Sequence, residues 1–94
     1  MEELLNQSQI QDALANSTWV LNGQTLVLDT EHSDFEAAWA FASQVADAAE
    51  RANHHPDILV HSWNKSQIVL STHSAGGITQ LDLDLAQAID AFRA

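Results

Sequence analysis

Residues 33–52 place apolar side chains at the spacing of one helix face, and the chain's only proline follows four residues after them. Ser33 and Glu36 have the spacing of a capping box, which typically begins a helix. Pro56 disfavours helical geometry at the residue before it, so the helix is expected to end near Ala52. Its buried face is predicted to contain the apolar residues that recur at helical spacing: Phe35, Trp39, Ala42, Val45 or Ala46, and Ala49.

Runs of β-type residues lie on both sides of this helix. Asn22-Gly23 is a common hairpin sequence and is predicted to join the two strands that precede the helix. Asn64-Lys65 is predicted to lie at the turn between the two strands that follow it. The four predicted strands occupy residues 19–21, 25–30, 57–63 and 67–72.

Two further helices are predicted near the ends of the chain. Asn6 with Gln9 begins the first, which fades near Asn16. Thr79 with Asp82 forms a capping box for the last, whose inner face is predicted to contain Leu81, Leu85, Ala88, Ile89 and Phe92. The order α-β-β-α-β-β-α implies an α+β fold, in which three helices pack on one face of a four-stranded antiparallel sheet. Residues 1–94 are expected to form a single domain.

The composition excludes several functions. Thirteen carboxylates against three Lys and Arg residues give a net charge of −10, so direct nucleic-acid binding is not expected. There is no cysteine for a disulfide or a thiolate zinc site, which fits a cytoplasmic protein. The chain begins with an acidic segment where a secretory signal would be basic, and no apolar run is long enough to span a membrane. A modest core in 94 residues favours self-association.

Three of the five histidines fall at ends of predicted elements. His54 and His55 lie between the long helix and the third strand, and His73 follows the fourth strand. Asp82 begins the last helix, and Glu50 lies one helical turn before His54. Because the third and fourth strands should pair as a hairpin, these side chains are expected to converge at one rim of the sheet. Imidazole gives and takes protons near neutral pH, so the group indicates acid–base chemistry.

Simpler interpretations exist for several of these residues. Asp82 has the position of a helix cap, and Glu50 that of an exposed helical residue. A zinc site is disfavoured because adjacent histidines in an extended segment point to opposite faces, and no helical His-x-x-x-His pair is present. No metal is therefore expected.

The remaining histidines and the tryptophans are expected to have structural positions. His32 and His61 are expected at the surface or in turns. The tryptophans Trp19, Trp39 and Trp63 are expected in the core or on the sheet, and Trp63 is also a candidate neighbour of the site.

The arrangement Glu50-x-x-x-His54-His55-Pro56, followed by Trp63, His73 and Asp82, resembles the signature of the pterin-4a-carbinolamine dehydratase family. The similarity extends through Asn64-Lys65, Ser71-Thr72-His73 and Gly76-Gly77-Ile78-Thr79. Members of that family convert a 4a-hydroxytetrahydropterin to a quinonoid dihydropterin, without metal or cofactor, on a fold of three helices against a four-stranded sheet. The resemblance implies that the catalytic residues are His54, His55 and His73, and that the supporting or substrate-binding residues are Glu50, Pro56, Trp63, Thr72 and Asp82.

The resemblance also implies partners and a second candidate role. It predicts a pterin substrate, a homodimer or homotetramer, and a functional link to an aromatic amino acid hydroxylase that uses the pterin. The alternative is a non-catalytic dimerisation or assembly protein with the same fold, which would not need the complete histidine set present here. Some members carry an aromatic residue where this chain has Ile58, so stacking of a pterin at that position is not expected.

Overall fold

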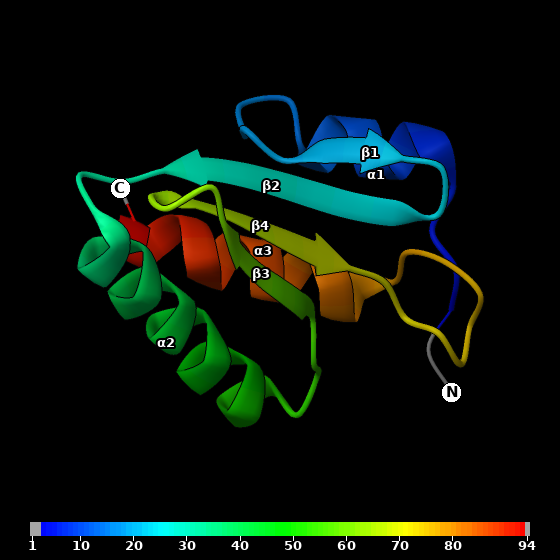
Figure 1. Cartoon of the computed structure of the whole chain (residues 1–94). Coiled ribbons are helices and arrows are strands. Elements are labelled where there is room, and N and C mark those ends of the chain that lie inside the picture. Colours follow the sequence, from blue (N-terminus) through cyan, green and yellow to red (C-terminus); the bar gives the residue numbers. More distant parts are fainter. Residues whose placement is uncertain (1–2, 94) are drawn as a thin grey trace.

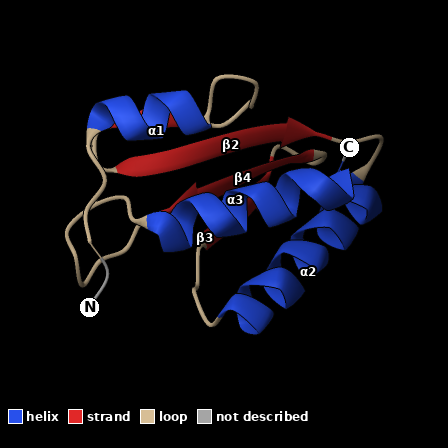
Figure 2. Cartoon of the chain, turned by 180° about the vertical axis from the view of Figure 1, so that it is seen from behind, coloured by secondary structure: helices blue, strands red, loops and turns tan. Residues whose placement is uncertain are grey.

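The computed structural model describes residues 3–93, and its three helices and four strands follow the predicted order. The strands form an antiparallel sheet in the order β1-β2-β4-β3, so β4 lies between β2 and its hairpin partner β3. All three helices cover one face of this sheet, which confirms the predicted α+β class (Figures 1 and 2). The elements are α1 (Gln7–Ala13), β1 (Val20–Asn22), β2 (Thr25–Glu31), α2 (Phe35–Ala52), β3 (Asp57–His61), β4 (Lys65–Leu70) and α3 (Gln80–Arg93).

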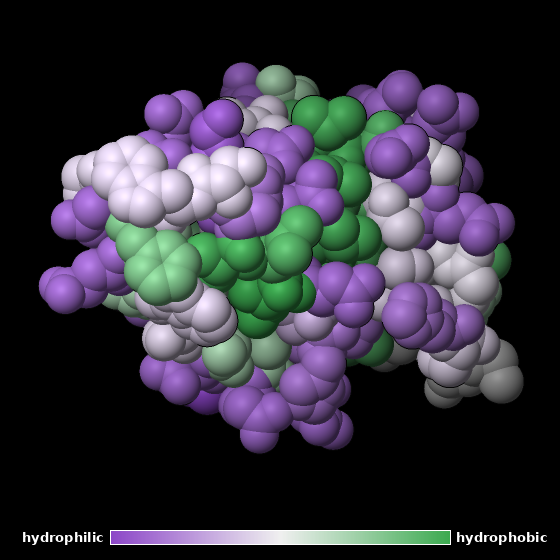
Figure 3. All heavy atoms as spheres, in the orientation of Figure 1, coloured by the Kyte–Doolittle hydropathy of each residue, from purple (hydrophilic) through white to green (hydrophobic). Residues whose placement is uncertain are grey.

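The core lies between the helices and the inner face of the two central strands. Leu26 and Leu28 of β2 pair with Leu70 and Ile68 of β4, and none of the four is exposed to solvent. Alternate residues of these strands face away from the helices, since successive side chains in a strand point to opposite faces. On that outer face apolar side chains gather in a visible patch (Figure 3). Val20 of β1 pairs with Val27, so it also lies on the outer face, and it is 61% exposed.

Helix α2 ends at Ala52 as predicted, but its start and its buried face differ from the prediction. The N-cap is Asp34, whose side chain accepts a hydrogen bond from the Ala37 N–H at 2.8 Å, so the predicted Ser33–Glu36 capping box is wrong. Phe35 and Trp39, predicted to be buried, are each 51% exposed and pack edge to face against one another. The buried face instead consists of Ala38, Phe41, Ala42, Val45, Ala48 and Ala49.

The two hairpin turns are each shifted from the predicted position. The first is Gly23-Gln24, with Gly23 at φ +62°, a conformation that glycine adopts without steric cost. The second occupies residues 62–64, so β3 ends at His61 and β4 begins at Lys65. Trp63 lies in this turn with φ +73° and is 62% exposed, so its predicted packing is wrong. Trp19 is buried as expected.

Helices α1 and α3 begin with the predicted caps. Asn6 and Gln9 form the predicted capping box of α1, although this helix already ends at Ala13. In α3 the Asp82 side chain accepts the Thr79 N–H at 2.9 Å. The buried residues of α3 are Asp82, Leu83, Leu85, Ala86 and Ile89, while the predicted Leu81 and Phe92 are partly buried and Ala88 is exposed. Over residues 3–93, the structure contains no helix with the length and apolarity needed to cross a membrane.

Candidate active site

His54 is held between the end of α2 and the start of α3. Its backbone N–H bonds to the Ala49 carbonyl at 3.1 Å, directly after the left-handed C-cap residue Asn53. Its Nε2 lies 2.6 Å from Oδ1 of Asp82. The His54 side chain is 11% exposed and that of Asp82 is fully buried, so water screens this contact weakly. Asp82 therefore both caps α3 and binds His54.

The second carboxylate oxygen of Asp82 is also fully engaged. Oδ2 accepts the Thr79 N–H at 2.9 Å and the Thr72 hydroxyl at 2.8 Å. The hydroxyls of Thr72 and Thr79 lie 2.8 Å apart, and both residues are buried. Among residues 3–93, no buried side-chain nitrogen or oxygen lacks a hydrogen-bond partner. The burial of a carboxylate is thus compensated by hydrogen bonds on both oxygens, as such burial requires.

His55 has a more open environment than its neighbour. Its Nε2 is hydrogen-bonded to Oε2 of Glu50 on the last turn of α2. The His55 and Glu50 side chains are 61% and 75% exposed, so solvent screens their attraction and the pair contributes little to stability. Glu50 is consequently both an exposed helical residue and the partner of a histidine.

His73 and His55 line the same small cavity, of about 30 Å³, with Thr25, Asp57, Val69 and Ser71. His73 begins the turn 73–76, which the backbone closes through a bridge between Thr72 and Gly77. Gly76 in this turn has φ +82°, where a side chain would be strained. The imidazole of His73 is exposed on a loop that main-chain bonds hold in place.

The structure brings most of the predicted residues to one end of the β3–β4 hairpin. His54, Thr72 and Asp82 share one hydrogen-bonded network, and His55 with His73 borders one cavity. Pro56 is half-buried between His55 and the start of β3. Trp63 is not brought to them: it lies at the opposite end of this hairpin, beyond the five residues of β3. At about 3.3 Å per strand residue, that separation is roughly 15–20 Å within one chain.

Sequence reasoning missed two groups at this end of the sheet. Thr79 was predicted as a helix cap and was not assigned to the site, yet its hydroxyl contacts that of Thr72. Asp57 and Ser71 share the cavity of His55 and His73, although the sequence analysis assigned neither of them to the site. The sequence position of Asp57 could have indicated its place near the histidines. Asp57 directly follows His55-Pro56 and begins the strand that pairs with β4.

No cluster of three or more His, Asp or Glu side chains within residues 3–93 is arranged to hold a metal ion. Each of the two adjacent histidines is instead hydrogen-bonded to its own carboxylate: His54 to Asp82, and His55 to Glu50. Such pairs fix the orientation of an imidazole, which positions it to give or take a proton.

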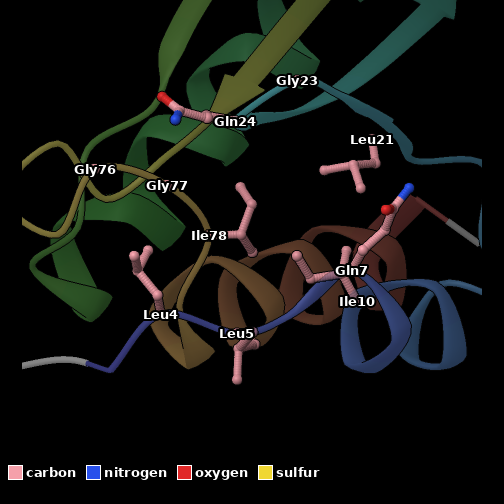
Figure 4. A pocket seen from close by; sticks show the side chains of 10 residues that line it. All are labelled: Leu4, Leu5, Gln7, Ile10, Leu21, Gly23, Gln24, Gly76, Gly77 and Ile78. Atoms are coloured by element: carbon pink, nitrogen blue, oxygen red, sulfur yellow. The ribbon is translucent and has the colours of Figure 1, made fainter.

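A separate cavity of about 380 Å³ lies between the N-terminal segment, the β1–β2 turn and the loop before α3 (Figure 4). Leu4, Leu5, Ile10, Leu21 and Ile78 line it together with glycines and two glutamines, and no histidine reaches it. Among residues 3–93, its lining offers no titratable group. This cavity is therefore distinct from the histidine cluster.

Comparison with known proteins identifies the family. The family model for pterin 4 alpha carbinolamine dehydratase matches residues 3–92, nearly all of the chain. The protein belongs to this family.

Individual relatives extend the match. A Nocardia farcinica protein named "Putative pterin-4-alpha-carbinolamine dehydratase" is 46% identical over 89 residues, and the match covers 94% of this chain and 93% of that protein. A protein with the same name from Trichormus variabilis is 42% identical over 90 residues, and the match covers 95% of this chain and 96% of that protein. The crystal structure of a transcriptional coactivator/pterin dehydratase from Brucella melitensis superposes with a TM-score of 0.87 at 30% identity, over 98% of this chain and 100% of that one. A pterin dehydratase-like RuBisCO assembly factor of the alpha-carboxysome shares the fold, with a TM-score of 0.64 at 20% identity, over 81% and 89% of the two chains.

Proposed function

We propose that this protein dehydrates a 4a-hydroxytetrahydropterin to the quinonoid dihydropterin, with His54, His55 and His73 as the catalytic histidines. The observation that carries the proposal is their placement: all three lie at one end of the β3–β4 hairpin, and two are hydrogen-bonded to separate carboxylates. The family match and the dehydratase names of the relatives support the same reaction.

The proposed elimination needs two proton transfers and no other reagent. One imidazolium donates a proton to the 4a-hydroxyl as the C4a–O bond breaks, and the oxygen leaves as water. A neutral imidazole takes the proton from N5, and the N5 electron pair forms the C4a=N5 double bond. One proton is given and one is taken, so the enzyme returns to its starting charge. Each such transfer typically contributes about 10²–10⁴-fold in rate.

The decisive experiment is a rapid-mixing assay with chemically generated 4a-hydroxytetrahydropterin, with the uncatalysed dehydration subtracted. We expect a dehydration rate above that background, and we expect this excess rate to increase in proportion to protein concentration. A rate indistinguishable from the background would instead support the alternative role without catalysis. The structural neighbour from the alpha-carboxysome is named as an assembly factor. We further propose that the enzyme acts in the cytoplasm. There it would take part in regenerating the pterin that an aromatic amino acid hydroxylase uses.

Metal removal tests the acid–base mechanism. Full activity is expected to survive exhaustive chelation and dialysis, because the proposed proton transfers use imidazoles that are paired with carboxylates. Elemental analysis of the purified protein is expected to find no stoichiometric zinc. Activity that disappears with the chelator and returns with a divalent ion would overturn the mechanism.

Self-association is proposed to involve the exposed edge strand β3. This strand ends the sheet order β1-β2-β4-β3, and its Leu59 is 52% exposed. Unpaired edges with apolar side chains favour pairing with a second copy, and a lysine on the edge opposes it. Leu59→Lys is therefore expected to shift a dimer or tetramer towards monomer in light scattering at micromolar concentration. Gln11→Lys, an equal charge change on the exposed side of α1, is expected to leave the assembly unchanged. A monomeric wild-type protein would contradict the proposal.

A further inference from the structure

The buried hydrogen bonds around Asp82 have only one consistent direction. The Leu81 N–H donates to the Thr79 hydroxyl oxygen at 3.2 Å. The Thr79 hydroxyl proton is then free to donate to the Thr72 oxygen, 2.8 Å away. Thr72 in turn donates its own proton to Oδ2 of Asp82, because a carboxylate only accepts. Each hydroxyl thus gives one bond and receives one.

This direction determines what Asp82 presents to His54. Oδ2 receives two donors, the Thr72 hydroxyl and the Thr79 N–H, which fix the plane of the carboxylate. Oδ1 then faces His54 Nε2 at 2.6 Å as an acceptor. A neutral imidazole carries one proton, so donation from Nε2 leaves Nδ1 as the nitrogen with the free electron pair.

We propose that Thr79 is a positioning residue which, through Thr72 and Asp82, holds neutral His54 as the Nε2-protonated tautomer, so that Nδ1 is its proton acceptor. The inference rests on the proposed function for its consequence: the proton from N5 of the substrate goes to Nδ1 of His54. The imidazolium that forms lies against a fully buried carboxylate, which stabilises the charge. The proton for the leaving hydroxyl then comes from one of the two exposed imidazoles, His55 or His73.

The tautomer can be measured without substrate. Nitrogen-15 NMR of histidine-labelled protein at about pH 9, well above the ordinary imidazole pKa of about 6.5, distinguishes the two ring nitrogens. Wild-type His54 is expected to show a protonated Nε2 and a bare Nδ1. Thr79→Val keeps the side-chain shape but removes the hydroxyl, and is expected to produce a mixture of tautomers. Thr79→Ser restores the hydroxyl and is expected to restore the single tautomer.

Two further variants separate positioning from helix capping. Thr72→Val leaves the Thr79 cap of α3 in place and is expected to give the same mixture as Thr79→Val. Thr30→Val removes a hydroxyl from a different hydrogen-bonded group, with Ser66 and His32 at the far end of the sheet, and is expected to leave His54 unchanged. A single wild-type tautomer in both Thr79→Val and Thr72→Val, with folding confirmed by circular dichroism, would overturn the inference.

Kinetics give a second reading. Thr79→Val is expected to lower kcat about tenfold with little change in KM, roughly the effect of one lost hydrogen bond, and Thr79→Ser to recover it. Equal kcat in Thr79→Val and wild type would count against the positioning role. If the wild-type protein has no dehydratase activity but shows the expected tautomers, the proposed function fails and the assignment of the His54 tautomer stands.

Discussion

Replacement of His73 by alanine is expected to lower dehydratase turnover by about 10²–10⁴-fold, the usual contribution of one acid–base group. The fold should tolerate the change, because the His73 side chain is exposed and the turn that carries it is closed by main-chain hydrogen bonds. The far-ultraviolet circular dichroism spectrum and the melting temperature should therefore remain close to those of the wild type. Turnover is measured with the uncatalysed reaction subtracted.

His61→Ala is the matched control for this experiment. His61 ends β3 at the opposite end of the hairpin, where its Nδ1 is hydrogen-bonded to the neighbouring Ser62 hydroxyl. Near-normal turnover is expected for this variant. Equal losses in the His73 and His61 variants, or no loss in either, would show that the assigned histidines are wrong.

Asp82→Ala is expected to have the largest effect on stability, lowering the free energy of unfolding by about 2–4 kcal/mol. The substitution leaves three buried donors without their acceptor: the Thr79 N–H, the Thr72 hydroxyl and His54 Nε2. It also removes the carboxylate that orients His54, so turnover should fall as well. Urea denaturation measures the loss of stability.

Asp84→Ala provides the comparison on the same helix. Asp84 is exposed, and its side chain accepts a hydrogen bond from Gln80 within α3. Its replacement is expected to change the free energy of unfolding by less than about 0.5 kcal/mol, as is usual for an exposed position. Similar losses for both variants would mean that the network around Asp82 does not contribute to stability as described.

The order of the elements could be predicted from the sequence because local signals agree with the final fold. The Asn6–Gln9 capping box and the break at Pro56 are both local. The orientation of α2 could not be predicted in the same way. The predicted inner face included the large apolar side chains of Phe35 and Trp39, which are exposed. The buried face of α2 instead contains small residues such as Ala38 and Ala48. Alanine lets a helix approach a sheet closely, and that packing is decided by tertiary contacts.

The same distinction holds for the site. His54, His55 and His73 could be identified by spacing, and their placement at ends of elements followed from the predicted hairpin. The contact between the Thr72 and Thr79 hydroxyls could not, because it depends on how the loop between them closes. A turn that closes one residue later would place Thr72 on another face.

The position of Asp82 has a consequence for the order in which the molecule assembles. Its carboxylate joins residues that are 28 and 10 positions away in the chain, at the end of α2 and the end of β4. Both loops must close before His54 acquires its partner, and closing a loop costs chain entropy that only the finished contacts repay. A partly folded chain with an intact α2 and a formed β3–β4 hairpin would still lack the paired His54. The pairing of His54 with a carboxylate therefore requires the docking of α3, whereas the pair of His55 with Glu50 does not involve that helix.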